Sequence, residues 1–231
     1  MLIRVVDLET TGMSPDDAVC EVGWHDVIVG DTAAPGGFTE GLCNPGRPIP
    51  PEARAIHHIS DAMVAGAPQP VSLFARVMNG ADAFCAHNAA FERQFFGGGD
   101  KPWICTLKVS RRLWPECPSH SNQCLRYFLG LELDDALAMP PHRAGPDTYV
   151  TGHILREALK LATVDQMVAW TKQPSLLPHV TFGKHKGQKW SSLPADYLAW
   201  IVHKSDMDAD TKFTAKHHLN AAASERDHSR F

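Results

Sequence analysis

The sequence lacks any apolar run that approaches the roughly 20 residues needed to cross a lipid bilayer. It also lacks a basic leader, because the N-terminus enters a predicted strand directly, and we therefore expect a cytoplasmic protein with no membrane partner. No Cys-x-x-Cys pair occurs among the six cysteines, several of which lie in apolar runs, which predicts free thiols. Collagen-like, disordered and coiled-coil compositions are absent as well. What remains is a chain of 231 residues, 44% of them hydrophobic, which can bury one sizeable core and leave a small appended unit.

Net charge is also low, at −4 at pH 7, and this value alone does not favour a nucleic-acid partner. The charges are unevenly distributed, however. Residues 173–231 hold eight Lys or Arg and six Asp or Glu, so this segment is positive and the rest of the chain is negative. Bound cations would offset acidic side chains in the larger segment, and contacts with a polyanion can then be local.

Acidic side chains follow several of the predicted buried elements. Residues 2–6 (LIRVV) predict a buried strand, and residues two apart on a strand point to the same face, so Asp7 and Glu9 share one face. Two carboxylates about 7 Å apart repel each other, and a divalent cation is the natural compensation if they are buried. The alternative is an ordinary strand end whose acids face water.

A second acid follows another short apolar run, residues 83–86 (AFCA). Asn88 is a good helix N-cap, and Glu92 then falls in the first turn of the predicted helix. This arrangement directs Glu92 beyond the strand ends. The alternative is an acid favoured at a helix N-terminus by the macrodipole alone.

A third segment pairs a histidine with an acid ahead of a predicted helix. Its apolar positions repeat every three or four residues, at Val150, Ile154, Ala158 and Leu161. Pro146 is compatible with the start of this helix, because proline is tolerated where the backbone N–H has no helical partner. His142 is then expected in the preceding loop and Asp147 in the first helical turn.

Together these three segments resemble the motifs of the proofreading-type (DEDDh) 3′→5′ exonucleases, which end in Asp-x-Glu, Asn-x-x-Phe-Asp and His-x-x-x-x-Asp. They stand here in that order as residues 7–12 (DLETTG), 88–92 (NAAFE) and 142–147 (HRAGPD). Each motif alone is weak evidence, but the three together are specific. Further segments are most similar to the exodeoxyribonuclease X branch of that superfamily, namely residues 102–106 (PWICT), 111–115 (RRLWP) and 181–184 (TFGK). The resemblance covers nearly the whole chain.

Two positions depart from the family pattern. Glu92 stands where the family usually has aspartate, and the extra methylene could move a carboxylate by about 1.5 Å, which is large for a preorganised metal site. His58, within the segment His-His-Ile, stands where the family commonly has glycine. The first departure bears on the rate or the choice of metal ion, and the second on the shape of the pocket for the terminal nucleotide.

The resemblance implies an active site with two divalent ions, Mg²⁺ or Mn²⁺, which suit hard oxygen ligands. Asp7 would bridge them, Glu9 and Asp147 would complete one site, and Glu92 would hold the second ion directly or through water. His142 is the expected general base, since a histidine can exchange protons near neutral pH.

The resemblance also implies residues that contact the substrate. Backbone groups around Thr10 and Thr11 are expected to meet the terminal 3′-hydroxyl, and Met13 to wedge against the last bases. Asn88 and Phe91 would line the same groove. For Met13 and Phe91 the alternative is plain core packing.

The implied function is release of nucleoside 5′-monophosphates from the 3′ ends of single-stranded or duplex DNA, in DNA repair or end trimming. Two alternatives stay open: an RNA-trimming exoribonuclease of the same superfamily, and a nucleic-acid-binding relative whose activity is weakened. The motifs do not separate DNA from RNA, because the phosphate is common to both and contacts at the 2′ position decide.

The fold that the resemblance implies is ribonuclease-H-like: a mixed five-stranded α/β sheet flanked by helices, with residues 20–29 and 37–43 as further strands. Prolines bracket a linker at 173–178, which separates an exonuclease domain at 1–172 from a small basic α+β domain at 179–231. Strands are expected there at 179–182 and 188–193, around a lysine-rich turn, with helices after Pro194 and from Ala209. This turn, with Lys184, Lys186 and Lys189, could hold a phosphate backbone or be merely a solvated hairpin.

Overall fold

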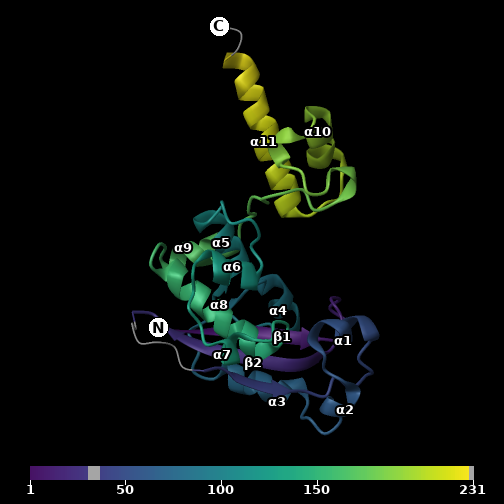
Figure 1. The fold of residues 1–231 in the computed structure, drawn as a ribbon, viewed down its shortest axis with the longest axis vertical. Coiled ribbons are helices and arrows are strands. Elements are labelled where there is room, and N and C mark those ends of the chain that lie inside the picture. The colour runs from purple at the N-terminus through teal and green to yellow at the C-terminus, as the bar shows by residue number, and fades with distance from the viewer. Residues whose placement is uncertain (31–36, 229–231) are drawn as a thin grey trace.

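The computed structural model describes residues 1–30 and 37–228, and its core is a five-stranded sheet (Figure 1). The sheet order is β3-β2-β1-β4-β5. The first three strands pair antiparallel, whereas β4 and β5 run parallel to β1. The strand bounds are β1 Leu2–Thr10, β2 Val19–Ile28, β3 Thr39–Leu42, β4 Ala83–Ala86 and β5 Trp103–Cys105. The predicted mixed sheet is therefore confirmed, and the strands expected near residues 20–29 and 37–43 are both present.

The central strand β1 is longer than the sequence pattern predicted, and the two acids lie within it. Pairing with β2 continues past Val6, with Asp7 opposite Gly23 and Glu9 opposite Glu21. Because side chains alternate along a strand, the acids extend the row formed by Ile3 and Val5. Ile3 and Val5 belong to an apolar cluster that also contains buried residues of the helix Ala144–Leu159, such as Val150 and Ile154.

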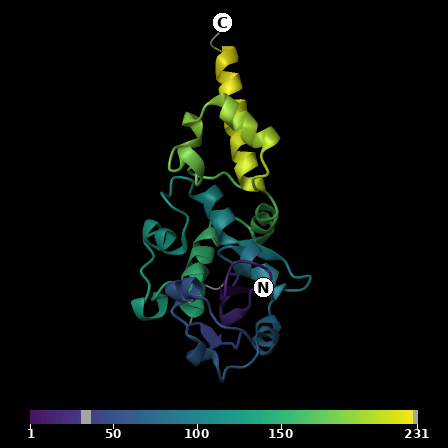
Figure 2. The ribbon, with the colours of Figure 1, turned by 90° about the vertical axis from the view of Figure 1, so that its right-hand side faces the viewer.

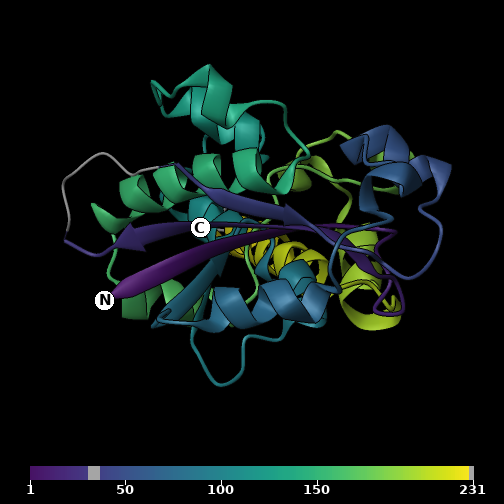
Figure 3. The ribbon, with the colours of Figure 1, turned by 90° about the horizontal axis from the view of Figure 1, so that it is seen from below.

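Helices cover both faces of the sheet, as expected (Figure 3). The long helix α8 (Ala144–Leu159) packs on β2 and β1, and α3 (Pro70–Met78) packs on the opposite face of β2. The other helices of this region are α1 Pro51–His57, α2 Asp61–Val64, α4 Ala89–Phe96, α5 Thr106–Leu113, α6 Asn122–Phe128, α7 Asp135–Ala138 and α9 Val164–Thr171. Asn88 is the N-cap of α4, although its side chain makes no capping hydrogen bond there.

The C-terminal segment is helical, and the two strands predicted within it are wrong. Residues 179–228 form two turns of 3₁₀ helix, η1 (Gly183–His185) and η2 (Trp190–Ser192), followed by α10 (Ala195–Lys204) and α11 (Ala209–His228), with no strand among these described residues. The two predicted arms share only the bonds Val180 N–H to Gln188 O and Gly187 N–H to Val180 O. They diverge where Gly183 and Gly187 adopt φ of 60° and 86°, and Trp190 turns inward. An α+β description therefore does not apply to this segment.

This segment has an apolar cluster of its own, which includes Val180, Trp190 and Ile201. It sits at one end of the molecule, beyond α5 and α9 (Figures 1 and 2). Residues 173–178, which were expected to be a linker, also make contacts with the C-terminal segment. Ser175 is buried, and Asp210 of α11 accepts hydrogen bonds from its backbone N–H and its hydroxyl, both at 3.0 Å.

The six cysteines are all free thiols, as predicted. None of the helices in the described ranges is long and apolar enough to span a membrane.

Candidate active site

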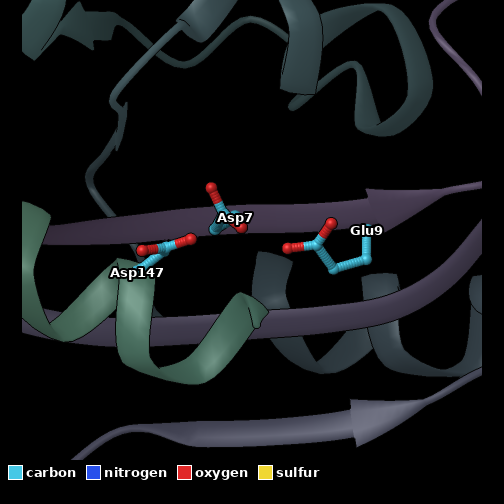
Figure 4. A group of neighbouring side chains, drawn as sticks. All are labelled: Asp7, Glu9 and Asp147. Carbon is cyan, nitrogen blue, oxygen red and sulfur yellow. The ribbon is translucent and has the colours of Figure 1, made fainter. Parts of the chain in front are cut away.

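Three of the predicted carboxylates meet at the surface where β1 passes the start of α8 (Figure 4). Asp7 and Glu9 come from β1, and Asp147 comes from the first turns of α8. One oxygen from each residue lies within 4.8 Å of the other two. This spacing is suitable for binding one cation between the three side chains.

A glycine allows α8 to approach the sheet closely enough for this meeting. Gly23, the β2 partner of Asp7, lies directly against the start of α8. A Cβ atom at Gly23 would lie 2.7 Å from the Gly145 nitrogen and would overlap the Ala144 carbonyl. Any larger residue at this position would therefore push α8, and Asp147 with it, away from β1.

Glu92 enters the same pocket from α4. The pocket has a volume of about 470 Å³, and its walls include Asp7, Glu9, Glu92, His142 and Asp147. The Glu92 side chain is only 3% exposed, and its Oε2 has no hydrogen-bond partner among the described residues. A buried, unpaired carboxylate oxygen is costly unless a ligand or an ion satisfies it.

The four acids of the pocket are buried or partly buried close to one another, and this raises their pKa values. Burial, followed by the charge of Asp147, raises the pKa of Asp7 well above its usual range. Burial likewise raises the pKa of both Glu9 and Glu92 to about 8, and it also raises the pKa of Asp147. Among the described side chains, those of residues 1–30 and 37–221, no Lys or Arg forms an ion pair with any of these four acids.

The nearby Arg143 forms its ion pair with Glu21 of β2, and its charge acts on Glu9 without a direct ion pair. Its Nε donates to Glu21 Oε2 at 2.9 Å, and its Nη2 donates to Oε1 at 2.5 Å. The four pocket acids therefore form an all-oxygen donor set, and none of them is paired with a described Lys or Arg side chain. Such a set fits hard divalent cations such as Mg²⁺ or Mn²⁺ and does not resemble a zinc site.

His142 lies in the loop before α8, as predicted, and its exposed side chain lines the pocket. Its backbone adopts φ of 61°, and its N–H donates to Asp147 Oδ2 at 2.8 Å. The backbone of His142 thus orients the Asp147 carboxylate, while the imidazole stays free to meet water and substrate.

Four of the five predicted substrate-binding residues line the pocket: Thr10, Met13, Asn88 and Phe91. Met13 is 73% exposed, which excludes core packing for it, and Phe91 is partly buried against Phe95. Thr11 is not among the lining residues. Its hydroxyl instead accepts from the Ala18 N–H at 3.0 Å and donates to Asp17 at 3.3 Å, which fixes the turn after β1.

Helix α1 supplies a wall of the pocket, of which the sequence analysis indicated only the C-terminal end, around His58. Glu52, Ile56 and His57 all line it. His57 is buried, its Nδ1 accepts from the Ile59 N–H at 3.0 Å, and its Nε2 lies 3.3 Å from Thr10 O. The spacing of Glu52 and Ile56, four apart on one helix face, is the signal that could have identified this wall.

Comparison with known proteins gives consistent results at the level of family and fold. The family described as Exonuclease (RNase T) matches residues 5–155. Exodeoxyribonuclease 10 of Escherichia coli K12 is 34% identical over 224 residues, which cover 94% of this chain and 99% of that protein. The DNA polymerase III subunit epsilon-like protein of Rhodobacter capsulatus is 31% identical over 159 residues, covering 64% of this chain and 22% of that protein. The resemblance predicted from the three motifs is therefore confirmed.

Comparison with solved structures supports the same assignment. Exonuclease X in complex with 5′ overhanging duplex DNA superimposes with a TM-score of 0.64 and 34% identity, covering 73% of this chain and 99% of that one. The nuclease domain of 3′hExo, a DEDDh family member bound to rAMP, has a TM-score of 0.55 at 15% identity, covering 69% of this chain and 92% of that one. The second likeness shows a shared fold alone.

Proposed function

The chain belongs to the exonuclease family, and on this premise we propose that it removes nucleotides from the 3′ end of DNA as nucleoside 5′-monophosphates. The observation that carries the proposal is the meeting of Asp7, Glu9 and Asp147 within 4.8 Å, with Glu92 in the same pocket. Retention of an acid or histidine at all five motif positions supports an active enzyme over a weakened binding relative.

Exonucleases of the DEDDh type depend on divalent metal ions, and the four pocket acids are the proposed ligands of two Mg²⁺ or Mn²⁺ ions. When bound, such ions neutralise charge at the scissile phosphate and the leaving 3′-oxygen and make water a better nucleophile. The unpaired Oε2 of Glu92 and the raised pKa values of the acids support this assignment.

His142 is the proposed general base. Its exposed imidazole at the pocket wall can accept a proton from the attacking water and pass it to solvent. Met13, Asn88 and Phe91 form walls against which the terminal nucleotides pack, and the backbone of Thr10 and Thr11 is the proposed contact for the terminal 3′-hydroxyl.

DNA is favoured over RNA as the substrate by the relatives that share most of this chain. The relative that matches 94% of the chain is named as an exodeoxyribonuclease, and the matched exonuclease X structure contains duplex DNA. The RNA-related structures match at 14% and 15% identity and support the fold alone. RNA trimming is therefore an outcome to be tested and not the favoured function.

We also propose that the chain divides into an exonuclease domain at 1–172, a linker at 173–178 and a small basic domain at 179–231. The separate apolar cluster around Trp190 supports this division. The exposed Lys184, Lys186 and Lys189 make the turn between η1 and η2 a suitable contact for a phosphate backbone.

The experiment is hydrolysis of labelled single-stranded DNA, duplex DNA and RNA with Mg²⁺ or Mn²⁺, with the released nucleotide identified by chromatography. We expect 5′-monophosphates from DNA. His142→Ala should lower kcat by roughly 10²- to 10⁴-fold, and Asp7→Asn by at least as much. Glu92→Asp should keep or raise activity, because aspartate is the usual family residue.

Asp165→Asn is the matched control, since Asp165 is an exposed acid of α9 outside the pocket. Wild-type activity in Asp7→Asn would remove Asp7 from the metal site. Faster hydrolysis of RNA than of DNA would instead establish the exoribonuclease alternative.

A further inference from the structure

The C-terminal segment carries an aromatic stack at the edge of its apolar core, and Tyr197 packs against that core. The rings of Tyr197 and Trp200, one turn apart on α10, lie 5.7 Å apart at 18°, and His185 of η1 lies 4.8 Å from Tyr197. The fully buried core residues of the same helix are Leu198 and Ile201. Trp200 is 43% exposed and is not part of that cluster.

Positive charge surrounds this stack. Residues 183–204 contain four lysines, all exposed, and one acid, Asp196. The lysine-rich turn lies against the stack, because a Cβ atom at Gly183 would lie 3.6 Å from the Tyr197 hydroxyl. Lys184 and Lys186 therefore flank His185 beside the rings. The stack ends in the exposed ring of Trp200, while Tyr197 and His185 are partly buried. An exposed ring at the end of a stack, beside lysines, matches the chemistry of a single-stranded nucleic acid, whose bases stack and whose phosphates are negative.

A second hollow lies between the catalytic pocket and the C-terminal segment that carries this stack. Asn88 lines that pocket and also this hollow, which has a volume of about 290 Å³. The other walls of this hollow include Thr181 of the C-terminal segment and side chains of both charges, namely Lys108, Arg111, Asp208 and Asp210. Thr181 lies two residues before Gly183 and the lysine-rich turn. Figures 1 and 2 also place α10 on the side of the molecule where α1, a wall of the pocket, is found.

We propose that His185, Tyr197 and Trp200 form a stacking platform that binds the bases of a DNA single strand upstream of its 3′ end, with Lys184 and Lys186 on the phosphates. The inference rests on the proposed function only in that the bound strand is the one whose 3′ end enters the pocket. The platform would retain the strand while successive nucleotides are removed.

The test measures binding of 5′-fluorescein-labelled (dT)20 to the full chain in EDTA, where no hydrolysis occurs. We expect Trp200→Ala to weaken binding roughly tenfold and Trp200→Phe to restore most of it, because phenylalanine keeps a stacking face. Lys184→Gln with Lys186→Gln should lower the slope of log affinity against log salt by roughly 1.4. Quenching of tryptophan fluorescence on binding should shrink in Trp200→Phe.

Phe213→Ala is the matched control, since Phe213 of α11 is equally exposed at 43% and has no ring contact among the described residues. The proposed platform would be refuted if the affinity of Trp200→Ala for (dT)20 lay within twofold of the wild type. An equal loss of affinity in Phe213→Ala would refute it as well. A loss of affinity in Trp200→Ala that is confined to fully duplex DNA would also contradict the proposal.

Hydrolysis of a trinucleotide should be unchanged in Trp200→Ala. Failure of every variant and the wild type to hydrolyse it would refute the proposed function while leaving the binding result intact.

Discussion

At the scale of single residues, Glu9 and Glu92 hold their protons to a higher pH in the folded protein than in the unfolded chain. Burial raises the pKa of each from 4.5 to about 8. A carboxyl group shifted in this direction contributes stability that is full below pH 4.5 and is lost as the pH rises through 8. We therefore predict that the metal-free protein loses stability between about pH 5 and 8, by on the order of a few kcal/mol.

Thermal melts in EDTA across this pH range measure the effect. Saturating Mg²⁺ or Mn²⁺ should flatten the pH dependence, because a cation stabilises the ionised acids and takes the place of the protons. Glu92→Gln should reduce the slope in EDTA, whereas Asp165→Asn should leave it unchanged. An identical slope with and without metal would show that these acids do not bind the cation.

His58 adopts a left-handed backbone, with φ of 60°, at the C-cap of α1. A side chain in this region costs about 1–2 kcal/mol relative to the right-handed region, whereas glycine does not carry this cost. Glycine also loses more entropy on folding, so we predict that His58→Gly raises the free energy of unfolding by about 0.5–1 kcal/mol. Denaturant unfolding of the wild type and the variant measures this change in the free energy of unfolding.

His58→Ala is the control, because alanine removes the imidazole and keeps the Cβ atom. It should leave stability near that of the wild type. Equal stabilisation by alanine and glycine would mean that the imidazole, and not the backbone, is the source of the strain.

At the scale of elements, the first turn of α8 is held by carboxylates from two strands. Glu21 of β2, only 1% exposed, accepts from Arg143 and from the Ala144 N–H at 2.9 Å, and Glu40 of β3 accepts from the Gly145 N–H at 3.2 Å. These acids lie at the positive end of the helix, where negative charge is favourable. The pair formed by Glu21 and Arg143 thereby fixes the loop that presents His142.

We predict that Arg143→Gln lowers kcat about tenfold with an unchanged KM for a short oligonucleotide, because the loop that carries His142 is no longer held in place. Stability should also fall by about 3–5 kcal/mol, since Glu21 becomes a buried unpaired charge. The double variant Glu21→Gln with Arg143→Gln should recover the stability but not the kcat. If stability and kcat both recovered in the double variant, the role of Arg143 would be purely structural.

The elements around the site differ in how far the sequence could predict them. Alternation along β1 placed Asp7 and Glu9 on one face, because that property is local. Their strand was predicted to end at Val6, since acids rarely lie within a buried strand and only the pairing with β2 extends it. The contact of Glu21 with Arg143 joins positions 122 residues apart, so no local pattern could indicate it.

At the scale of the whole molecule, the C-terminal segment shows why short patterns misled. Residues 188–193 were predicted as a strand, but no neighbouring strand completes a ladder, and Trp190 instead enters a cluster with Ile201 and Leu198. Helices α10 and α11 were predicted correctly, because Pro194 and the alanine-rich stretch act locally. The conformation of residues 179–193 depends instead on tertiary packing, which the sequence pattern does not display.

Asp210 of α11 is the main polar link between the C-terminal segment and the rest of the protein. It accepts from Arg111 at 2.9 Å and from both the backbone and the hydroxyl of Ser175, and Lys108 lies 3.8 Å away. These side chains surround the hollow that adjoins the catalytic pocket at Asn88. Removal of this carboxylate should therefore loosen the segment without touching the four pocket acids.

We predict that Asp210→Ala leaves hydrolysis of a trinucleotide at the wild-type rate and lowers affinity for a 20-nucleotide strand about tenfold, because the basic turn no longer lies in line with the pocket. Truncation after Pro178 should give the same pattern with a smaller salt dependence of binding. Asp206→Ala, which changes an acid of the same segment outside this contact, should behave as wild type. Loss of trinucleotide hydrolysis in Asp210→Ala would instead place the segment within the catalytic unit and contradict the proposed division of the chain.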